Sequence, residues 1–352
     1  MRARAWAALA LAILLTGCSW MDGSYVSVTP HQVAQSPVAE ATTRIVRNYT
    51  ELRSALVRMV DDGTTEALLT LEGYPRENAE ADVKQAVEYV TKFYPLGAYA
   101  VEQIDTSVGA YAISVDIIYG RTAQELASIR TVRGMESAQK AVTEAMDECS
   151  DKLVLRISGY EPVDFPELAR SYAQLNPDRV MENPSVTVRT VPDKGDERVV
   201  ELLFFYRTDR ESLRAMREQV QPVFSSAALY VSGQASERTK FSQLHAFLTE
   251  RFDYRYQSSQ TMAYSLLCEG VGDSRAFAQV YAAMCSRIGL EAKSVTGTRA
   301  GEKHHWNLVR IDGAWYHLDL LGSAQFRPMT DWDMEGYDWD RDAYPAATGI
   351  AE

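Results

Sequence analysis

The chain has 352 residues, of which 46% are hydrophobic and 24% charged, and its formal net charge is −12. This length predicts two or three domains, and the composition excludes a disordered or collagen-like chain. Four cysteines are too few for a disulfide-stapled scaffold. The acidic balance argues against nucleic acid as a partner, because proteins that bind it present basic surfaces to the phosphates.

The N-terminus has the pattern of an export signal. Two arginines precede an apolar run over 6–15, which is too short to span a bilayer. The run ends in the letters LTGC at 15–18, which resemble a bacterial lipobox. That resemblance implies a signal peptide over 1–17 and a lipid on Cys18, so that the mature chain is extracytoplasmic and anchored to a bacterial membrane. A plain secretory signal is the alternative. Residues 18–40 show no sustained period and are predicted to form a tether.

The middle of the chain contains a weak repeat at an offset of about 86 residues. Each copy has a helical pattern, a strand that ends in Gly-Tyr, a polar helix, two strands and a further helix. The clearest match joins the strand at 112–119 to the strand at 199–206. The pattern predicts two small α/β modules of the order α-β-α-β-β-α, over 41–131 and 132–225. Neither copy contains a phosphate loop or a nucleophile elbow, so both are expected to be scaffolding or partner-binding modules.

The residues that carry chemistry lie in the last part of the chain, over 226–352. The string GDSR precedes an apolar helix that is predicted to begin near Ser274. Two strand-like runs follow at 304–310 and 314–320, joined by an Asp-Gly pair that is a strong hairpin signal. The first run begins His-His-Trp-Asn, and the second contains Trp-Tyr-His-Leu-Asp.

These motifs resemble those of the transglutaminase-like superfamily, whose domains have a papain-related fold. In that family a cysteine opens the core helix, a His-x-Trp-Asn motif starts one strand and a Trp-Tyr-His-x-Asp motif lies on the next. The resemblance implies an α+β, papain-like transglutaminase-core domain in which His304 and Asp319 belong to a catalytic triad. Family spacing places the nucleophile at Ser274, with serine in place of cysteine. In such a triad the aspartate orients the histidine, and the histidine acts as the base.

Cys268 is a second candidate nucleophile, because the string CEG at 268–270 also resembles a family motif. It lies six residues before Ser274 and is expected in the loop ahead of the helix. The N-terminus of a helix helps to stabilise a thiolate, so this displacement disfavours Cys268. A disulfide between Cys268 and Cys285 is a further alternative outside the cytoplasm.

The cleft residues expected beside the triad are Cys268, Trp306, Asn307 and His317. No cofactor and no metal is expected. A metal site built from His304, His305 and His317 with Asp319 is an alternative, although no spacing typical of zinc ligands supports it.

Serine fits poorly in a site shaped for a Cys–His ion pair, because an alcohol needs base catalysis throughout the reaction. We therefore expect a catalytically inactive domain that binds protein or peptide, held at the membrane by the lipid on Cys18. The alternative is an active acyl-transfer enzyme of the peptidase, amidase or transglutaminase type. It would use Ser274 or Cys268 together with His304 and Asp319.

Overall fold

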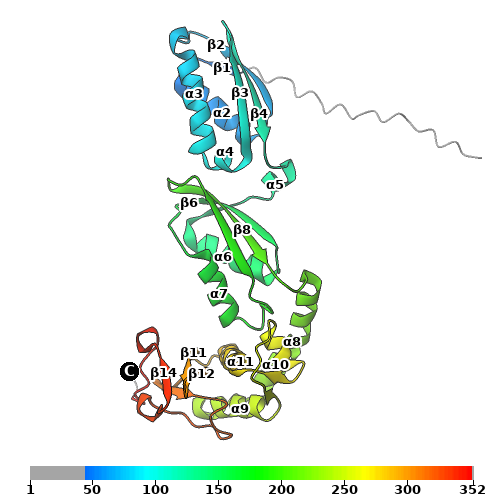
Figure 1. Cartoon of the computed structure of the whole chain (residues 1–352), viewed down its shortest axis with the longest axis vertical. Helices are drawn as coiled ribbons and strands as arrows, with labels where there is room; N and C mark the ends of the chain where they lie inside the picture. Colours follow the sequence, from blue (N-terminus) through cyan, green and yellow to red (C-terminus); the bar gives the residue numbers. More distant parts are fainter. Residues whose placement is uncertain (1–43, 351–352) are drawn as a thin grey trace, which may run out of the picture.

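Three folded units follow one another along the chain in the computed structural model, which describes residues 44–350 (Figure 1). The predicted signal peptide over 1–17, the predicted lipidation site Cys18 and the tether over 18–40 lie outside the described residues. Within 44–350, no helix has the length and apolar character needed to cross a bilayer. The predicted α+β fold class is confirmed, since each unit combines helices with a largely antiparallel sheet.

The first unit is a four-stranded sheet with two long helices packed on one face (Figure 1). Its elements are β1 (Arg44–Val46), α2 (Tyr49–Asp61), β2 (Glu66–Leu71), α3 (Arg76–Lys92), α4 (Pro95–Ala100), β3 (Val101–Val108), β4 (Ala112–Tyr119) and α5 (Ala123–Ala127). The strand order is β1-β2-β4-β3, in which β1 runs parallel to β2 and the other neighbours are antiparallel. Leu69 and Ile113 alternate with outward-facing residues and are buried against the helices.

The second unit has the same strand order and directions as the first. Its elements are β5 (Arg130–Arg133), α6 (Gly134–Asp147), β6 (Lys152–Ser158), α7 (Phe165–Leu175), β7 (Ser185–Val191), β8 (Glu197–Phe205) and α8 (Arg210–Tyr230). The sheet order is β5-β6-β8-β7, with β5 parallel to β6 and the other neighbours antiparallel. The duplication of the two modules stays a prediction from the sequence.

Both units begin with a short strand, whereas the sequence pattern predicted that each opens with a helix. The strands β1 and β5 have only three and four residues. Segments of this length are too short to reveal a two-residue period. Their pairing with β2 and β6 is a long-range contact that local sequence patterns do not encode.

The third unit places a buried helix against a four-stranded antiparallel sheet. Its elements are α9 (Glu237–Thr249), β9 (Asp253–Tyr254), α10 (Met262–Leu267), β10 (Val271–Gly272), α11 (Ser274–Arg287), β11 (Ala292–Arg299), β12 (Glu302–Ile311), β13 (Ala314–Leu318), η1 (Asp331–Asp333), β14 (Tyr337–Trp339) and η2 (Arg341–Ala343). The sheet order is β13-β12-β11-β14, so the C-terminal segment supplies an edge strand. The strands β9 and β10 form a separate parallel pair.

The predicted hairpin between β12 and β13 is confirmed. Ile311 pairs with Ala314, so the loop has two residues, Asp312 and Gly313. Their φ angles are 51° and 86°, the left-handed values that a type I′ turn requires at both central positions. This turn sets the register in which Leu318, at the end of β13, pairs with Asn307 of β12, and Asp319 just beyond it reaches His304.

The two faces of β12 pack against different parts of the third unit. On one face Asn307 donates from Nδ2 to the carbonyl oxygen of Ala278 in α11, at 2.8 Å, and Val309 belongs to the core around that helix. On the other face Trp306 and Leu308 pack with Met334 of the C-terminal segment. Successive side chains of a strand point to opposite faces, so this alternation extends to the residues at the start of β12.

Helix α8 joins the second unit to the third. Its residues Val220, Phe224 and Ala227 are buried in the same core as Phe277 and Tyr281 of α11. The module boundary predicted between 225 and 226 falls inside this helix. The apolar face of α8 therefore packs in a core that contains residues of both the second and the third unit.

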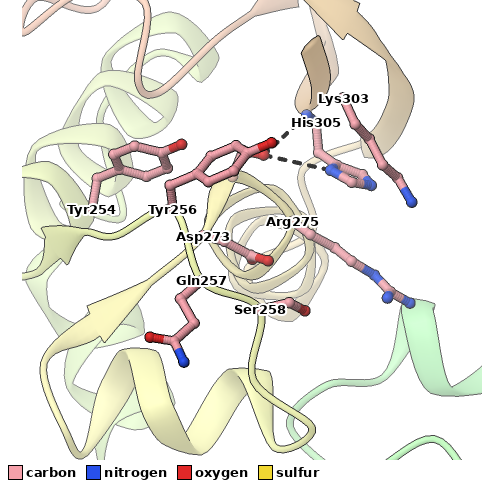
Figure 2. A pocket seen from close by; sticks show the side chains of 9 residues that line it. Tyr254, Tyr256, Gln257, Ser258, Asp273, Arg275, Lys303 and His305 are labelled. Carbon is pink, nitrogen blue, oxygen red and sulfur yellow. Dashed lines mark hydrogen bonds between the residues drawn. The ribbon is translucent and has the colours of Figure 1, made fainter.

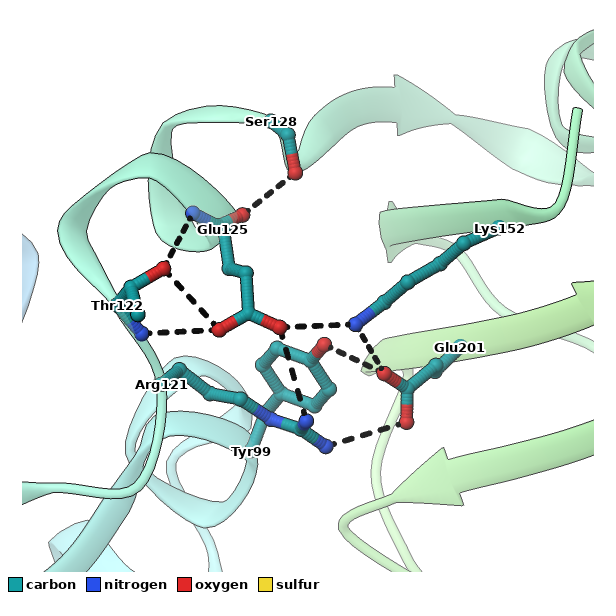
Figure 3. A network of polar contacts seen from close by, with 7 residues as sticks. All are labelled: Tyr99, Arg121, Thr122, Glu125, Ser128, Lys152 and Glu201. Atoms are coloured by element: carbon teal, nitrogen blue, oxygen red, sulfur yellow. Dashed lines mark hydrogen bonds and ion pairs between the residues drawn. The ribbon is translucent and has the colours of Figure 1, made fainter.

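The first and second units meet around the buried carboxylate of Glu201 in β8 (Figure 3). Its Oε1 accepts from Tyr99 of the first unit at 2.9 Å and pairs with Lys152 at 2.8 Å, and its Oε2 pairs with Arg121 at 3.2 Å. Burial opposes ionisation, but these partners together hold the pKa of Glu201 below its usual value. Tyr99 also packs with Val199 in a small apolar cluster at this junction.

We expect Glu201→Gln to loosen this junction without unfolding either unit. The amide keeps the shape but loses the charge that holds Arg121 and Lys152, while Glu125 remains as a partner for Lys152 at 3.2 Å. Hydrogen exchange measured by mass spectrometry should rise at least severalfold in α4 and β8 and stay unchanged in α11. Glu136→Gln, at an exposed position of α6, is the matched control. Equal exchange in both variants would show that the charge of Glu201 does not hold the units together.

Candidate active site

Ser274 is the first residue of α11. The carboxylate of Asp273 caps the helix by accepting from the backbone nitrogen of Ala276 at 2.8 Å. The hydroxyl of Ser274 is buried against the start of β12, where its Oγ accepts from the backbone nitrogen of His305 at 3.3 Å. The same Oγ lies 3.5 Å from Nδ1 of the His305 ring.

His304 and Asp319 form a buried pair. The His304 Nε2 lies 2.9 Å from Oδ2 of Asp319 and donates to it. The same Oδ2 accepts from the Tyr337 hydroxyl at 2.7 Å and from Arg299 Nη1 at 3.2 Å, and Oδ1 accepts from the Leu321 backbone at 2.9 Å. Burial works against ionisation of Asp319, but the hydrogen bonds outweigh it and its pKa is lowered. The aspartate is therefore a fixed anion that holds the imidazole.

The three residues predicted as a triad are split into two pairs. Ser274 contacts His305, whereas Asp319 contacts His304. Within residues 44–350, no hydrogen bond joins Ser274 to His304. The His304 ring stacks on Trp306, with ring centroids 6.2 Å apart, on the face of β12 that packs against the C-terminal segment. The face toward α11 carries His305 instead. Adjacent histidines on one strand cannot both face the same side.

His305 is a weak base in this environment. Burial has the largest effect and, with the nearby charges of Arg275, Lys303 and His304, lowers its pKa to about 4. In the described part of the chain no carboxylate pairs with its ring. A general base works best with a pKa near the working pH, so His305 is neutral at pH 7 and activates an alcohol poorly.

Cys268 is exposed at the C-terminal end of α10, away from the N-terminus of α11. Partial desolvation and the neighbouring carboxylate of Glu269 raise the pKa of its thiol, which is opposite to what a thiolate nucleophile needs. Cys268 and Cys285 are both unpaired, and Cys285 is buried. The disulfide alternative is therefore wrong.

Trp306, Asn307 and His317 are interior residues. The prediction that they line the cleft is wrong. All three are fully buried, at 0% exposure. Trp306 donates from Nε1 to Nδ1 of His317 at 2.9 Å, and Nε2 of His317 donates to Asp331 at 2.8 Å. Strand alternation and the returning C-terminal segment seal these side chains inside the protein. Cys268 also lies outside the cleft walls.

The metal alternative does not assemble. Both ring nitrogens of His317 are used in hydrogen bonds, and Nε2 of His304 is used by Asp319. Among residues 44–350, no group of three or more His, Cys, Asp or Glu side chains is arranged to hold a metal ion.

The cleft itself consists of two adjoining hollows that share Tyr254, Tyr256 and Lys303. One, of about 250 Å³, contains Ser274, His305, Arg275, Asp273, Gln257 and Ser258 (Figure 2). The other, of about 260 Å³, contains His304, Arg299, Glu302 and Leu321. Sequence reasoning missed the two tyrosines because Tyr254 lies in the two-residue strand β9 and Tyr256 follows it, and neither belongs to a recognisable motif. Arg275 and Lys303 are sequence neighbours of predicted site residues, and this adjacency was the one available signal.

In the third unit a helix begins beside antiparallel strands, and these carry a histidine–aspartate pair at the positions that the sequence motifs indicated. Residues 225–320 match the sequence model of the transglutaminase-like superfamily, so this part of the chain is a transglutaminase-like domain. Curated proteins give no significant match.

Solved structures with some likeness are a TGase, a candidate cysteine protease from Cytophaga hutchinsonii and a candidate protease from Parabacteroides distasonis. The TGase is 11% identical, with 56% of each chain covered and a TM-score of 0.28. The second is 14% identical over 44% of this chain and 70% of that chain, with a TM-score of 0.27. The third is 9% identical over 47% and 39%, with a TM-score of 0.24. The chain spans about half of the length of the TGase.

The low pKa of His305 predicts a specific dependence of stability on pH. The unfolded chain binds a proton at His305 near pH 6.5, whereas the folded chain does so only near pH 4. Stability is therefore lost as the pH falls from 6.5 to 4, by up to about 3 kcal/mol from this group. We expect His305→Gln to lose less stability over this range than the wild type. Urea unfolding followed by tryptophan fluorescence measures this, because Trp306, Trp315, Trp332 and Trp339 all lie in the third unit.

Ser274→Ala is the control for this measurement, because it removes the hydroxyl but keeps the titrating ring. It should retain the wild-type pH dependence. If His305→Gln and Ser274→Ala show the same slope as the wild type, His305 titrates alike in the folded and unfolded states and the assignment is wrong.

Proposed function

We propose that the protein is an extracytoplasmic, membrane-anchored lipoprotein whose transglutaminase-like domain binds protein or peptide without catalysing acyl transfer. One observation carries the proposal: the hydroxyl of Ser274 lies against His305, while the histidine oriented by Asp319 is His304. The residue at the predicted nucleophile position and the oriented base are thus not joined.

The chemistry of Ser274 supports this proposal. An alcohol attacks a carbonyl only if a base removes its proton as the bond forms. The imidazole nearest to Ser274 has a pKa of about 4 and faces Arg275 and Lys303 rather than a carboxylate. Such a ring neither accepts the proton readily nor is stabilised after accepting it.

One observation favours the acyl-transfer alternative. The Asp319 carboxylate lies 2.9 Å from Nε2 of His304 and orients this histidine, as a working triad requires. The alternative therefore needs a movement that brings the Ser274 hydroxyl to the His304 ring. The next experiment separates these two functions.

We expect the folded wild-type protein to show no covalent adduct at Ser274 after treatment with a fluorophosphonate, a probe that phosphonylates activated serines with loss of fluoride. Intact-mass and peptide mass spectrometry would measure the adduct, and a panel of peptide amides would be assayed for turnover. Ser274→Ala sets the background, and heat-denatured wild type controls for nonspecific reaction. A stoichiometric adduct on Ser274 in the folded protein alone, or turnover that Ser274→Ala abolishes, would establish the acyl-transfer alternative.

Membrane anchoring is a separate part of the proposal and rests on the LTGC string at 15–18. We expect Cys18→Ser to lose incorporation of an alkyne-tagged fatty acid and to leave the membrane fraction, because acylation supplies the attachment. Cys268→Ser, which removes an exposed cysteine of the folded part, is the matched control and should stay labelled and membrane-bound. Labelling that persists in Cys18→Ser would place the lipid elsewhere, and a wild-type protein without labelling would leave only a secretory signal.

A further inference from the structure

The cleft beside Ser274 is open and partly aromatic. The ring of Tyr256 is 73% exposed and that of Tyr254 is 48% exposed, and both form the wall between the two hollows. Exposed tyrosines offer apolar area together with a hydroxyl that donates hydrogen bonds. Figure 2 shows both rings on one side of the hollow, with His305 and Lys303 on the other side. This wall fits an extended peptide better than a compact small molecule.

The charge of the cleft is opposite to that of the chain. Arg275 and Lys303 project from the wall beside His305 (Figure 2), and within residues 44–350 neither forms an ion pair. Arg299 is the third cation, and it contacts Asp319 at 3.2 Å while its side chain stays 41% exposed. The walls of the two hollows carry three basic side chains against two acidic ones, Asp273 and Glu302, whereas the formal net charge of the chain is −12.

The acidic groups near these cations are already engaged or lie at the rim. The carboxylate of Asp273 accepts the capping hydrogen bond from Ala276, and Asp319 accepts from four donors. Glu302 is exposed at the end of the second hollow. The Asp273 carboxylate lines the same hollow as Arg275 and Lys303. It forms no ion pair with either cation within residues 44–350, so both remain available to a ligand carboxylate. The downward effect of these two side chains on the pKa of His305 is consistent with a positive potential there.

We propose that this cleft binds an acidic peptide, with a carboxylate held between Arg275 and Lys303 and the adjoining residues packed on Tyr254 and Tyr256. This inference rests on the proposed function, since it names the chemistry of the ligand that the inactive site holds. Charge-assisted hydrogen bonds from a guanidinium and an ammonium give the carboxylate its preference. The net charge of −12 disfavours a long polyanion, because the chain as a whole repels extended negative charge.

The test compares three peptides that carry a neutral dye and share one length. The first contains two internal glutamates and ends in an amide, the second has glutamine at those positions and ends in an amide, and the third is the glutamine peptide with a free C-terminal carboxylate. Fluorescence anisotropy at low and physiological salt gives the affinities. The first peptide tests whether the cleft binds side-chain carboxylates, and the third tests whether it binds a C-terminal carboxylate.

We expect at least one carboxylate-bearing peptide to bind roughly tenfold more tightly than the neutral amide at low salt, and the difference to shrink as salt increases. Arg275→Gln and Lys303→Gln should each reduce the affinity for that peptide several-fold and leave the neutral peptide unaffected. Lys140→Gln, at an exposed lysine of the second unit, is the matched control. Circular dichroism confirms that each variant is folded.

Each failure has a distinct meaning. Equal binding of all three peptides, or an unchanged affinity in both cleft variants, would overturn the carboxylate preference and leave peptide binding in place. Cleavage of a bound acidic peptide would overturn the inactive function while supporting the ligand class. Failure of every peptide to bind at millimolar concentration would overturn both proposals.

Discussion

The two-residue period of strand β12 is the constraint on which the rest of the site depends. Two neighbouring histidines lie near the start of this strand, and the period directs His305 toward helix α11 and His304 toward the C-terminal segment. The next two residues alternate in the same way, with Trp306 facing the C-terminal segment and Asn307 facing α11. Because the faces are packed to the interior on both sides, the strand cannot rotate to exchange them. The separation of Ser274 from the acid–base pair follows from this packing.

The units around the site are joined by buried contacts more than by linkers. Helix α8 shares its apolar face with α11, and the carboxylate of Glu201 ties Tyr99 of the first unit to the sheet of the second. A buried charge is stable only while its partners are in place, which favours one relative arrangement of the two units. The transglutaminase-like domain is therefore held at the end of a series of connected units (Figure 1).

Net charge and local charge give opposite indications in this protein. The chain is acidic as a whole, yet Arg275, Lys303 and Arg299 gather at the cleft. The same two groups that would attract a carboxylate also lower the basicity of His305. Binding an anion and activating Ser274 are thus competing uses of one electrostatic environment. The geometry favours the first use.

The sequence by itself determined the local elements that carry the site. The Asp273 cap and the apolar period set the start of α11, and the Asp312-Gly313 turn sets the register that brings His304 to Asp319. These features depend on residues close together in the chain. Only the tertiary structure decided which histidine meets Ser274, and that Tyr337 and Tyr254 complete the surroundings. Those contacts join segments far apart in the sequence, and they are settled by how the faces of a sheet are covered, which no local pattern encodes.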